Sequence, residues 1–325
     1  MTSAGEGTGS RAVPPLLVIA GATATGKTAL AIDLALALRG DGISAEVISA
    51  DSRQVYRGLD IGTAKPTVEE RRGIVHHGLD LVDPDAAFSV GDFADHVAAV
   101  LPPVAAAGGL AILAGGTGFY LRAIAGGLDT TALPSDPAIR ARIEDELAAG
   151  GLEQAADRLA ALAPALAARV DRHNPRRVAR ALEIAELAGD RPLPAQKPYP
   201  GPVAWLGLRV EPATHARWIA DRARAQFAAG LVEEARALRE RFDPHLPAFS
   251  AIGYREAWAV LDGELTLEAA IELDARRNLQ FAKRQATWFR SEPAITWLPA
   301  GEPHRDSIAS VVADLVARPV SLRPG

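Results

Sequence analysis

A glycine-rich loop near the start of the chain constrains the fold more than any other feature. Residues 21–28, GATATGKT, fit the pattern G-x-x-x-x-G-K-[ST] and stand between an apolar run at residues 14–20 and the segment AIDLALAL. This order predicts a buried strand, a tight loop and a helix, which is the context in which the pattern binds phosphate. Glycines let backbone N–H groups turn towards an anion, and the helix N-terminus adds partial positive charge. The expected phosphate-binding residues are Gly21, Ala22, Thr23, Ala24, Thr25, Gly26, Lys27 and Thr28.

Two side chains of this loop carry specific chemistry. Lys27 supplies a mobile cation for phosphate oxygens, and the Thr28 hydroxyl is the expected protein ligand of Mg²⁺. The pattern indicates a bound polyphosphate or diphosphate and does not by itself specify ATP.

The pattern that follows alternates strands with helices. Apolar runs at residues 46–50, 79–82 and 110–114 predict strands, with a helix at residues 91–107 before the last of them. This alternation predicts an α/β fold, a P-loop NTPase-like doubly wound parallel sheet. From about residue 136 to residue 189 only helices are expected, which indicates an all-helical insertion domain. A strand at residues 203–210 and long helices within 220–241 and 266–290 return to the core.

We therefore expect four parts of the chain. They are a disordered tail at residues 1–12, a catalytic core at 13–127 and 200–298, a helical insertion at 128–199 and a C-terminal tail at 299–325.

Charge and composition limit the partners. A net charge of −5 and a pI near 5.9 argue against nucleic-acid binding by the whole surface, so any RNA must meet a local basic patch. The absence of cysteine excludes disulfides, thiolate catalysis and sulfur-ligated zinc, and it fits a reducing compartment. We find no signal peptide and no apolar run long enough to span a membrane. The sequence thus predicts a cytoplasmic protein with no membrane partner, and we expect a monomer.

Polar residues follow two further strands. Asp51 comes just after the strand at 46–50, where parallel sheets place functional groups, and could hold Mg²⁺ through water or accept a proton. A helix-capping or turn role for Asp51 stays open. The loop GGTGFY at residues 115–120 permits close approach of a ligand, or forms only a tight turn. The adjacent His76 and His77 point in different directions and are interpreted as structural.

Two segments are strongly basic. Residues 169–180, RVDRHNPRRVAR, carry five arginines. In the helix at 275–290 we expect a core stripe of Leu279, Ala282, Ala286 and Phe289, with basic residues on the opposite side and Phe281 and Trp288 beside them. Such a face suits RNA phosphates and stacked bases, or is a solvated face with its aromatics in the core. Its basic residues are Arg276, Arg277, Lys283, Arg284 and Arg290.

Several blocks occur in an order that resembles the tRNA dimethylallyltransferases, from about residue 16 to residue 297. The blocks are GATATGKT, SADSRQVYRGLDIGTAKP, HHGLD, GGTGFYLRAI, HNPRRVARALEI, SAIGYRE and AKRQATWFR. The resemblance implies Mg²⁺-dependent transfer of a dimethylallyl group from dimethylallyl diphosphate to N6 of the adenosine just 3′ of the anticodon. It also implies that the helical insertion grips the tRNA anticodon stem-loop.

The resemblance implies roles for individual residues. Asp51 would accept the N6 proton, while Lys27, Thr28 and Arg222 would neutralise the diphosphate. The chain departs from the family pattern at Ala22 and Thr25, where Pro and Ser are usual, and at Trp218, which replaces the first arginine of R-I-x-x-R. Contacts to tRNA are expected from Asp51, Ser52, Arg53, Gln54, Thr117, Arg140, Arg176, Arg177, Arg180, Arg276, Lys283 and Arg284.

The sequence also allows two other functions. A small-molecule or nucleoside kinase would use Asp51 to activate a hydroxyl for attack on ATP, which explains the first half of the chain but not the basic helices. A non-catalytic RNA-binding module would use the phosphate loop as a nucleotide switch.

Overall fold

The computed structural model of the protein describes residues 13–127, 133–191, 195–292, 294–302 and 304–316. The chain divides into a core unit, residues 1–126 and 198–325, and a helical unit, residues 127–197. The tail expected at residues 1–12 lies outside the described residues. Among the helices of the described part, none combines the length and apolar composition that crossing a bilayer requires.

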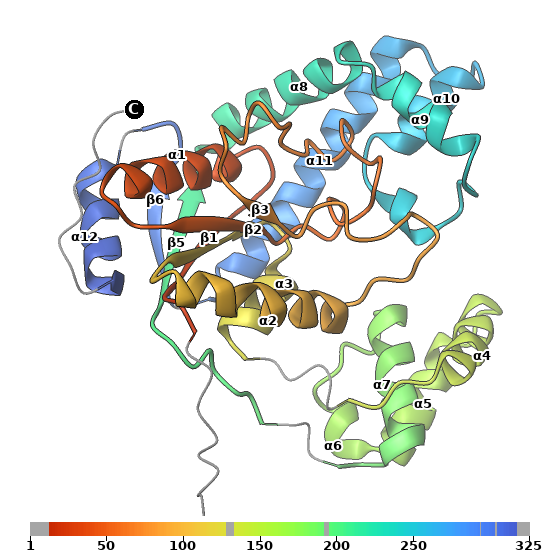
Figure 1. The fold of residues 1–325 in the computed structure, drawn as a ribbon. Helices are drawn as coiled ribbons and strands as arrows, with labels where there is room; N and C mark the ends of the chain where they lie inside the picture. Colours follow the sequence, from red (N-terminus) through yellow and green to blue (C-terminus); the bar gives the residue numbers. More distant parts are fainter. Residues whose placement is uncertain (1–12, 128–132, 192–194, 293, 303, 317–325) are drawn as a thin grey trace, which may run out of the picture. The chain divides into compact units, whose positions relative to one another are not determined.

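A six-stranded sheet forms the centre of the core unit (Figure 1). Its order is β3-β2-β4-β1-β5-β6, and every pairing is parallel. This arrangement confirms the α/β class predicted from the alternating pattern. The strands are β1 (Leu16–Gly21), β2 (Ala45–Ser49), β3 (His76–His77), β4 (Leu110–Gly115), β5 (Val203–Arg209) and β6 (Ile295–Pro299).

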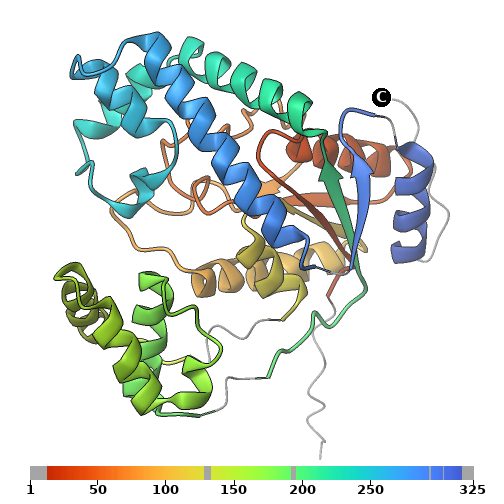
Figure 2. The same cartoon turned by 180° about the vertical axis from the view of Figure 1, so that it is seen from behind.

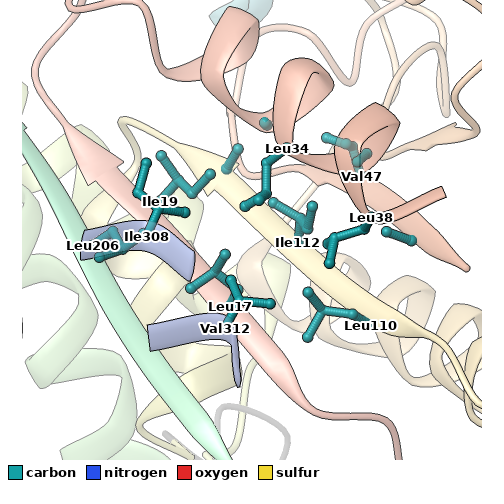
Figure 3. Close-up of a cluster of buried hydrophobic side chains, with 14 of the residues drawn as sticks. Leu17, Ile19, Leu34, Leu38, Val47, Leu110, Ile112, Leu206, Ile308 and Val312 are labelled. Carbon is teal, nitrogen blue, oxygen red and sulfur yellow. The ribbon is translucent and has the colours of Figure 1, made fainter. Parts of the chain in front are cut away.

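Helices cover both faces of the sheet. On one face, Leu17 and Ile19 of β1 pack with Leu34 of α1 (Lys27–Gly40) and Val312 of α12 (Arg305–Val316), as Figure 3 shows. On the other face, β1 packs against α2 (Val90–Ala106), α3 (Gly118–Ala125) and the end of α11 (Leu267–Phe289). Because both sides of β1 are buried, its sequence is a continuous apolar run without alternation. Each such buried Leu or Ile stabilises the fold by roughly 1.5–3 kcal/mol.

The end of the chain differs from the expected tail. Ile308, Val312 and Leu315 of α12 are buried in the first core cluster, and β6 is paired with β5. Residues 305–316 therefore belong to the core, so the prediction of a tail is wrong for them, while residues 317–325 lie outside the described residues.

The edge of the sheet also differs from prediction. The edge strand is β3 at residues 76–77, and residues 79–82 contribute only a single bridge between Tyr56 and Val82. Gly78 and Asp80 have φ angles of 78° and 53°, in the left-handed region that a strand cannot contain. The chain therefore leaves the sheet directly after His77.

A group of helices extends the core unit beyond the sheet. It consists of α8 (Pro212–Ala228), α9 (Leu231–Arg239), the short 3₁₀ helix η1 (Pro247–Ser250), α10 (Tyr254–Leu261) and α11. Thr266 caps α11 by accepting the Ala269 N–H at 3.2 Å. Figures 1 and 2 show α11 running beside α8 towards the sheet. Helix α11 can therefore contribute side chains to the loops at the ends of the strands.

The helical unit has a core of its own. Its helices are α4 (Pro137–Ala148), α5 (Leu152–Leu162), α6 (Pro164–Ala167) and α7 (Pro175–Ala188). Asp136 and Asn174 cap α4 and α7, each directly before a proline in the first turn. Ile143, Leu159 and Leu182 are buried between the helices. The bounds of the unit lie within two residues of the insertion expected at 128–199, and its contact with tRNA stays a prediction.

Candidate active site

The phosphate loop joins β1 directly to α1. Gly26 precedes the helix with φ 85°, a left-handed conformation that glycine adopts without strain. Ala24 also has a positive φ, 59°. A Cβ on Gly21 would lie 3.0 Å from the Leu208 carbonyl oxygen, so the loop runs close to β5. These constraints fix the loop at the carboxyl end of the central strand.

Lys27 lies in this loop without an acidic partner within ion-pair distance among the described residues. Its Nζ donates to the Ala22 carbonyl at 2.6 Å, while the Thr25 hydroxyl donates to the same carbonyl at 2.9 Å. Burial is the main reason that the pKa of Lys27 is lowered from 10.5 to about 8. The Arg222 guanidinium adds to this decrease, and the Asp51 carboxylate opposes it. A partly desolvated cation beside a second cation is arranged to receive an anion.

Gln285 of α11 ties the phosphate loop to the second glycine loop. Its Oε1 accepts the Thr23 N–H at 2.8 Å, and its Nε2 donates to the Gly116 carbonyl at 2.8 Å. His215 of α8 adds a hydrogen bond to the Thr23 carbonyl at 2.8 Å. Neither Gln285 nor His215 was expected at the site from the sequence. A signal for Gln285 was available in the spacing of α11. Gln285 lies three positions after Ala282 and four before Phe289, both of which are buried, so it lies on the buried face of the helix.

Asp51 follows β2 and has the turn role that the sequence left open, while its part in catalysis stays a prediction. Its Oδ1 accepts the N–H groups of Arg53 at 2.8 Å and Gln54 at 3.4 Å, which stabilises the turn. Its Oδ2 has no hydrogen-bond partner within the described part of the chain. Thr117 lies beside this turn, because its hydroxyl accepts the Ser52 N–H at 3.1 Å. The loops after β2 and β4 are thereby joined, and one carboxylate oxygen remains available.

Arg222 is the arginine that α8 contributes to the site. Its charge acts on Lys27, and the Asp51 charge acts on both cations, so the three groups form one electrostatic cluster. Arg217 is exposed and donates to the Thr214 hydroxyl at 3.3 Å. Trp218 points elsewhere, since a Cβ on Gly301 would lie 3.1 Å from its ring. Arg222, and not Arg217, is therefore the arginine of α8 whose charge acts on Lys27.

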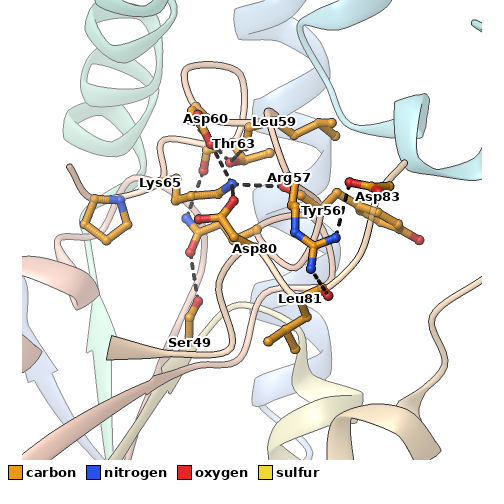
Figure 4. A network of polar contacts seen from close by, with 12 residues as sticks. Ser49, Tyr56, Arg57, Leu59, Asp60, Thr63, Lys65, Asp80, Leu81 and Asp83 are labelled. Atoms are coloured by element: carbon orange, nitrogen blue, oxygen red, sulfur yellow. Dashed lines mark hydrogen bonds and ion pairs between the residues drawn. The ribbon is translucent and has the colours of Figure 1, made fainter. Parts of the chain in front are cut away.

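The loop after Asp51 is held by a separate polar network (Figure 4). Lys65 is buried and donates to the Tyr56 carbonyl at 2.9 Å and to the Asp60 and Asp80 carboxylates, each at 2.6 Å. Gln54 accepts the Ser49 hydroxyl at 2.8 Å and donates to the carbonyls of Thr63 and Ala64. The Gln54 amide is thus committed to the protein, which corrects its expected contact with a nucleotide.

Some of the expected tRNA-binding arginines also have internal partners. Arg140 and Arg180 both bind Glu183, whose side chain is fully buried, at 2.7 Å. Because an unpaired buried carboxylate is unfavourable, these two arginines primarily neutralise Glu183. Arg277 likewise pairs with the buried Glu256. By contrast, five expected cations are exposed and have no acidic partner among the described residues: Arg176, Arg177, Arg276, Lys283 and Arg284.

The buried stripe of α11 is more polar than expected. It consists of Ala270, Asp274, Asn278, Ala282, Gln285 and Phe289. The prediction that Ala286 belongs to the core stripe is therefore wrong, because Ala286 is exposed. The predicted stripe also lacked the buried polar residues Asp274, Asn278 and Gln285. The Arg122 guanidinium lies 4.3 Å from the Trp288 ring centroid, and Trp288 packs on the sheet side. Phe281 remains 36% exposed, with the Arg284 guanidinium 5.7 Å from its ring centroid.

The donors near the phosphate loop fit a metal that is held partly by a substrate. Thr28 lies in the first turn of α1, and its hydroxyl has no hydrogen-bond partner in the described residues. No cluster of three His, Asp or Glu that could hold a metal occurs among those residues. A divalent cation here would therefore depend on Thr28 together with diphosphate oxygens and water. His77 instead bonds Glu46 at 2.6 Å, and His76 bonds the Ile74 carbonyl at 2.9 Å.

A phosphate loop at the carboxyl edge of a parallel sheet, with the Asp51 carboxylate acting on the charge of its lysine, defines an enzyme of the P-loop α/β class. Comparison with family models narrows this class. The model described as IPP transferase matches residues 54–292, and the one described as isopentenyl transferase matches residues 14–81. The chain belongs to the IPP transferase family, which confirms the resemblance found in the sequence.

Individual relatives agree with this assignment. The chain is 45% identical to the tRNA dimethylallyltransferase of Anaeromyxobacter sp. (strain K) over 314 residues, covering 95% of this chain and 99% of the relative. It is 44% identical to that of Roseiflexus sp. (strain RS-1) over 292 residues, covering 88% and 93%.

Solved structures have the same fold. The tRNA isopentenylpyrophosphate transferase of Bacillus halodurans superposes with a TM-score of 0.67 at 35% identity, covering 93% of this chain and 96% of that one. A eukaryotic dimethylallyltransferase acting on tRNA gives a TM-score of 0.74 at 24% identity, covering 95% and 81%, and shares the fold.

Proposed function

We propose that this protein transfers the dimethylallyl group of dimethylallyl diphosphate to N6 of the adenosine 3′-adjacent to the tRNA anticodon, position 37. The products are N6-(dimethylallyl)adenosine and diphosphate. The observation that carries the proposal is the cluster of Lys27 and Arg222 with the free Oδ2 of Asp51. The two cations suit a diphosphate leaving group, and the carboxylate oxygen suits a proton acceptor.

The first task of the site is to stabilise the leaving group. As the allylic C–O bond breaks, negative charge grows on the diphosphate, where the phosphate-loop N–H groups, Lys27 and Arg222 neutralise it. We propose Mg²⁺ as the divalent ion, held by Thr28 and diphosphate oxygens, where it would withdraw charge from the departing oxygen. Support for this ligand set comes from the Thr28 hydroxyl in the first turn of α1, which has no hydrogen-bond partner in the described part of the chain.

The second task is to activate the amine. The N6 lone pair of adenine is delocalised into the ring, so N6 attacks well only if its proton is removed as the N–C bond forms. Asp51 accepts that proton on Oδ2, while its Oδ1 stays bonded to the turn. The Thr117 hydroxyl and Ser52 lie beside Asp51 and would contact the adenosine, which must leave the stacked loop to reach the site.

The tRNA itself requires a basic surface. The exposed cations of α11 (Arg276, Lys283 and Arg284) and of α7 (Arg176 and Arg177) are the proposed contacts to the anticodon stem-loop. These cations are proposed as tRNA contacts because no acidic side chain in the described residues neutralises their charge. We also propose a cytoplasmic location, supported by the absence of cysteine.

One assay tests the function. The protein is incubated with undermodified tRNA, Mg²⁺ and labelled dimethylallyl diphosphate, and in parallel with labelled ATP. We expect label from the dimethylallyl group in tRNA, located at position 37 by nuclease mapping. Transfer of phosphate from ATP would support a kinase instead, and binding of tRNA without either reaction would support an RNA-binding module.

A further inference from the structure

Arg222 contacts the buried Asn278 of α11, which in turn contacts the buried Asp274 of the same helix. Its Nη2 donates to Oδ1 of Asn278 at 3.2 Å, and Nδ2 of Asn278 donates to Oδ1 of Asp274 at 2.8 Å. Asn278 and Asp274 are 7% and 1% exposed. Arg222 and Asp274 form no direct ion pair, so the amide of Asn278 lies between the guanidinium and the carboxylate in a linear chain of contacts.

The carboxylate determines which way the amide points. An ionised carboxylate only accepts hydrogen bonds, so the NH₂ group of Asn278 must face Asp274. A second donation from Nδ2 to the Asp274 carbonyl at 3.3 Å acts in the same direction. The amide oxygen is left for Arg222, which only donates. Reversal of the amide would place donor against donor at Arg222 and acceptor against acceptor at Asp274.

Asp274 is itself fixed by its surroundings. A Cβ on Gly253 would lie 3.1 Å from its Oδ2, and the Gly253 N–H donates to Glu256 at 3.0 Å. Glu256 pairs with Arg277 one turn along α11. Burial raises the pKa of Asp274 to about 6, with the Asn278 hydrogen bond opposing and the Glu256 charge adding to the rise. Asp274 is therefore ionised at the pH of an ordinary assay.

We propose that Asn278, oriented by Asp274, is a positioning residue that holds the Arg222 guanidinium towards the diphosphate. Arginine has a long side chain with many rotamers, and preorganisation of its guanidinium strengthens each bond that it makes to an anion. The inference rests on the proposed function in that diphosphate is the leaving group. It goes beyond that function because it assigns a role to Asn278 and Asp274, which act on the site through Arg222.

Binding of inorganic diphosphate by calorimetry at pH 7.5 tests the inference without requiring prenyl transfer. We expect Asn278→Ala to weaken this binding about tenfold, as the loss of one hydrogen bond to a charged group does. The Michaelis constant for dimethylallyl diphosphate should rise similarly, while that for tRNA stays within about twofold. Gln280→Ala, which removes an exposed amide two residues along the same helix, is the matched control and should change neither.

A double-mutant cycle separates positioning from general support of the fold. In an Arg222→Ala background, Asn278→Ala should weaken diphosphate binding no further, because the guanidinium to be positioned is gone. An equal loss in both backgrounds, or no loss in the first, overturns the inference. If the alanine variant does not fold, Asn278→Ser replaces it in the same cycle, because the serine side chain is too short to reach Arg222. If wild-type protein fails to prenylate tRNA, the proposed function fails while the diphosphate cycle still decides the role of Asn278.

Discussion

The side-chain oxygen of Gln285, near the end of α11, accepts the backbone N–H of Thr23 at 2.8 Å. The same amide donates to the Gly116 carbonyl, so one residue sets the spacing between the two glycine loops. The phosphate site is consequently assembled by α11 as well as by the strand and helix that flank the loop.

We expect Gln285→Met to destabilise the protein by about 1–3 kcal/mol, because it keeps the side-chain length but leaves both backbone groups without their partner. Turnover should fall as well, since the phosphate loop loses its fixed distance from the Thr117 loop. Urea unfolding and steady-state kinetics measure the two effects. Gln280→Met is the exposed control, and equal unfolding free energies for the two variants would contradict the role given to Gln285.

Replacement of the proposed base should separate chemistry from binding. Asp51→Asn keeps an oxygen for the Arg53 N–H but cannot accept the N6 proton, so we expect single-turnover prenylation to slow by ~10² to 10⁴. Filter binding of tRNA should remain within a few-fold of wild type. Near-normal turnover in this variant would remove Asp51 from the mechanism.

Diphosphate affinity should depend on pH through Lys27. In the free protein the pKa of Lys27 is lowered to about 8, so the amine is charged below that pH and neutral above it. A bound diphosphate favours the charged form, and affinity should therefore fall by up to about tenfold per pH unit above pH 8. Calorimetry with inorganic diphosphate between pH 7 and 9.5 measures this. The arginine of Lys27→Arg stays charged throughout this range, so the affinity of the variant should lack the fall above pH 8. Identical pH profiles of diphosphate affinity for wild type and variant would show that Lys27 does not titrate between pH 7 and 9.5.

Exposed cations of α11 should act on tRNA alone. We expect Lys283→Ala combined with Arg284→Ala to raise the Michaelis constant for tRNA several-fold and to flatten its dependence on salt, because fewer counterions are released. The Michaelis constant for dimethylallyl diphosphate should not change. Arg224→Ala, an exposed arginine of α8 that is paired with Asp221, is the control. Equal effects of the double variant and the control would exclude this face of α11 as an RNA contact.

Local sequence was sufficient for strands β1, β2, β4 and β5 and for the phosphate loop. The apolar runs at β1, β4 and β5 are long enough to indicate buried strands, and the pattern of the loop identifies its own residues. The short edge strand β3 could not be found in this way, because its end depends on the left-handed conformation of Gly78 against β2.

The burial of particular polar side chains could not be predicted from the sequence. Gln54 sits within a motif that suggests contact with substrate, yet its partners are backbone carbonyls nine and ten residues later. Asn278 and Gln285 lie on a helix whose periodicity favours apolar neighbours, and their burial follows from packing against α8 and the glycine loops. The roles of Asn278 and Gln285 depend on contacts between segments far apart in the chain, which periodicity within one helix does not record.

The bond between Thr23 and Gln285 spans 262 positions in the sequence. During synthesis, the phosphate loop and α1 leave the ribosome long before the residue that anchors them. A nascent chain that stops short of α11 therefore carries the complete GATATGKT motif without the support that sets its geometry. We therefore expect a polypeptide that ends before α11 to bind diphosphate more weakly than the full chain, even though it contains every residue of the loop.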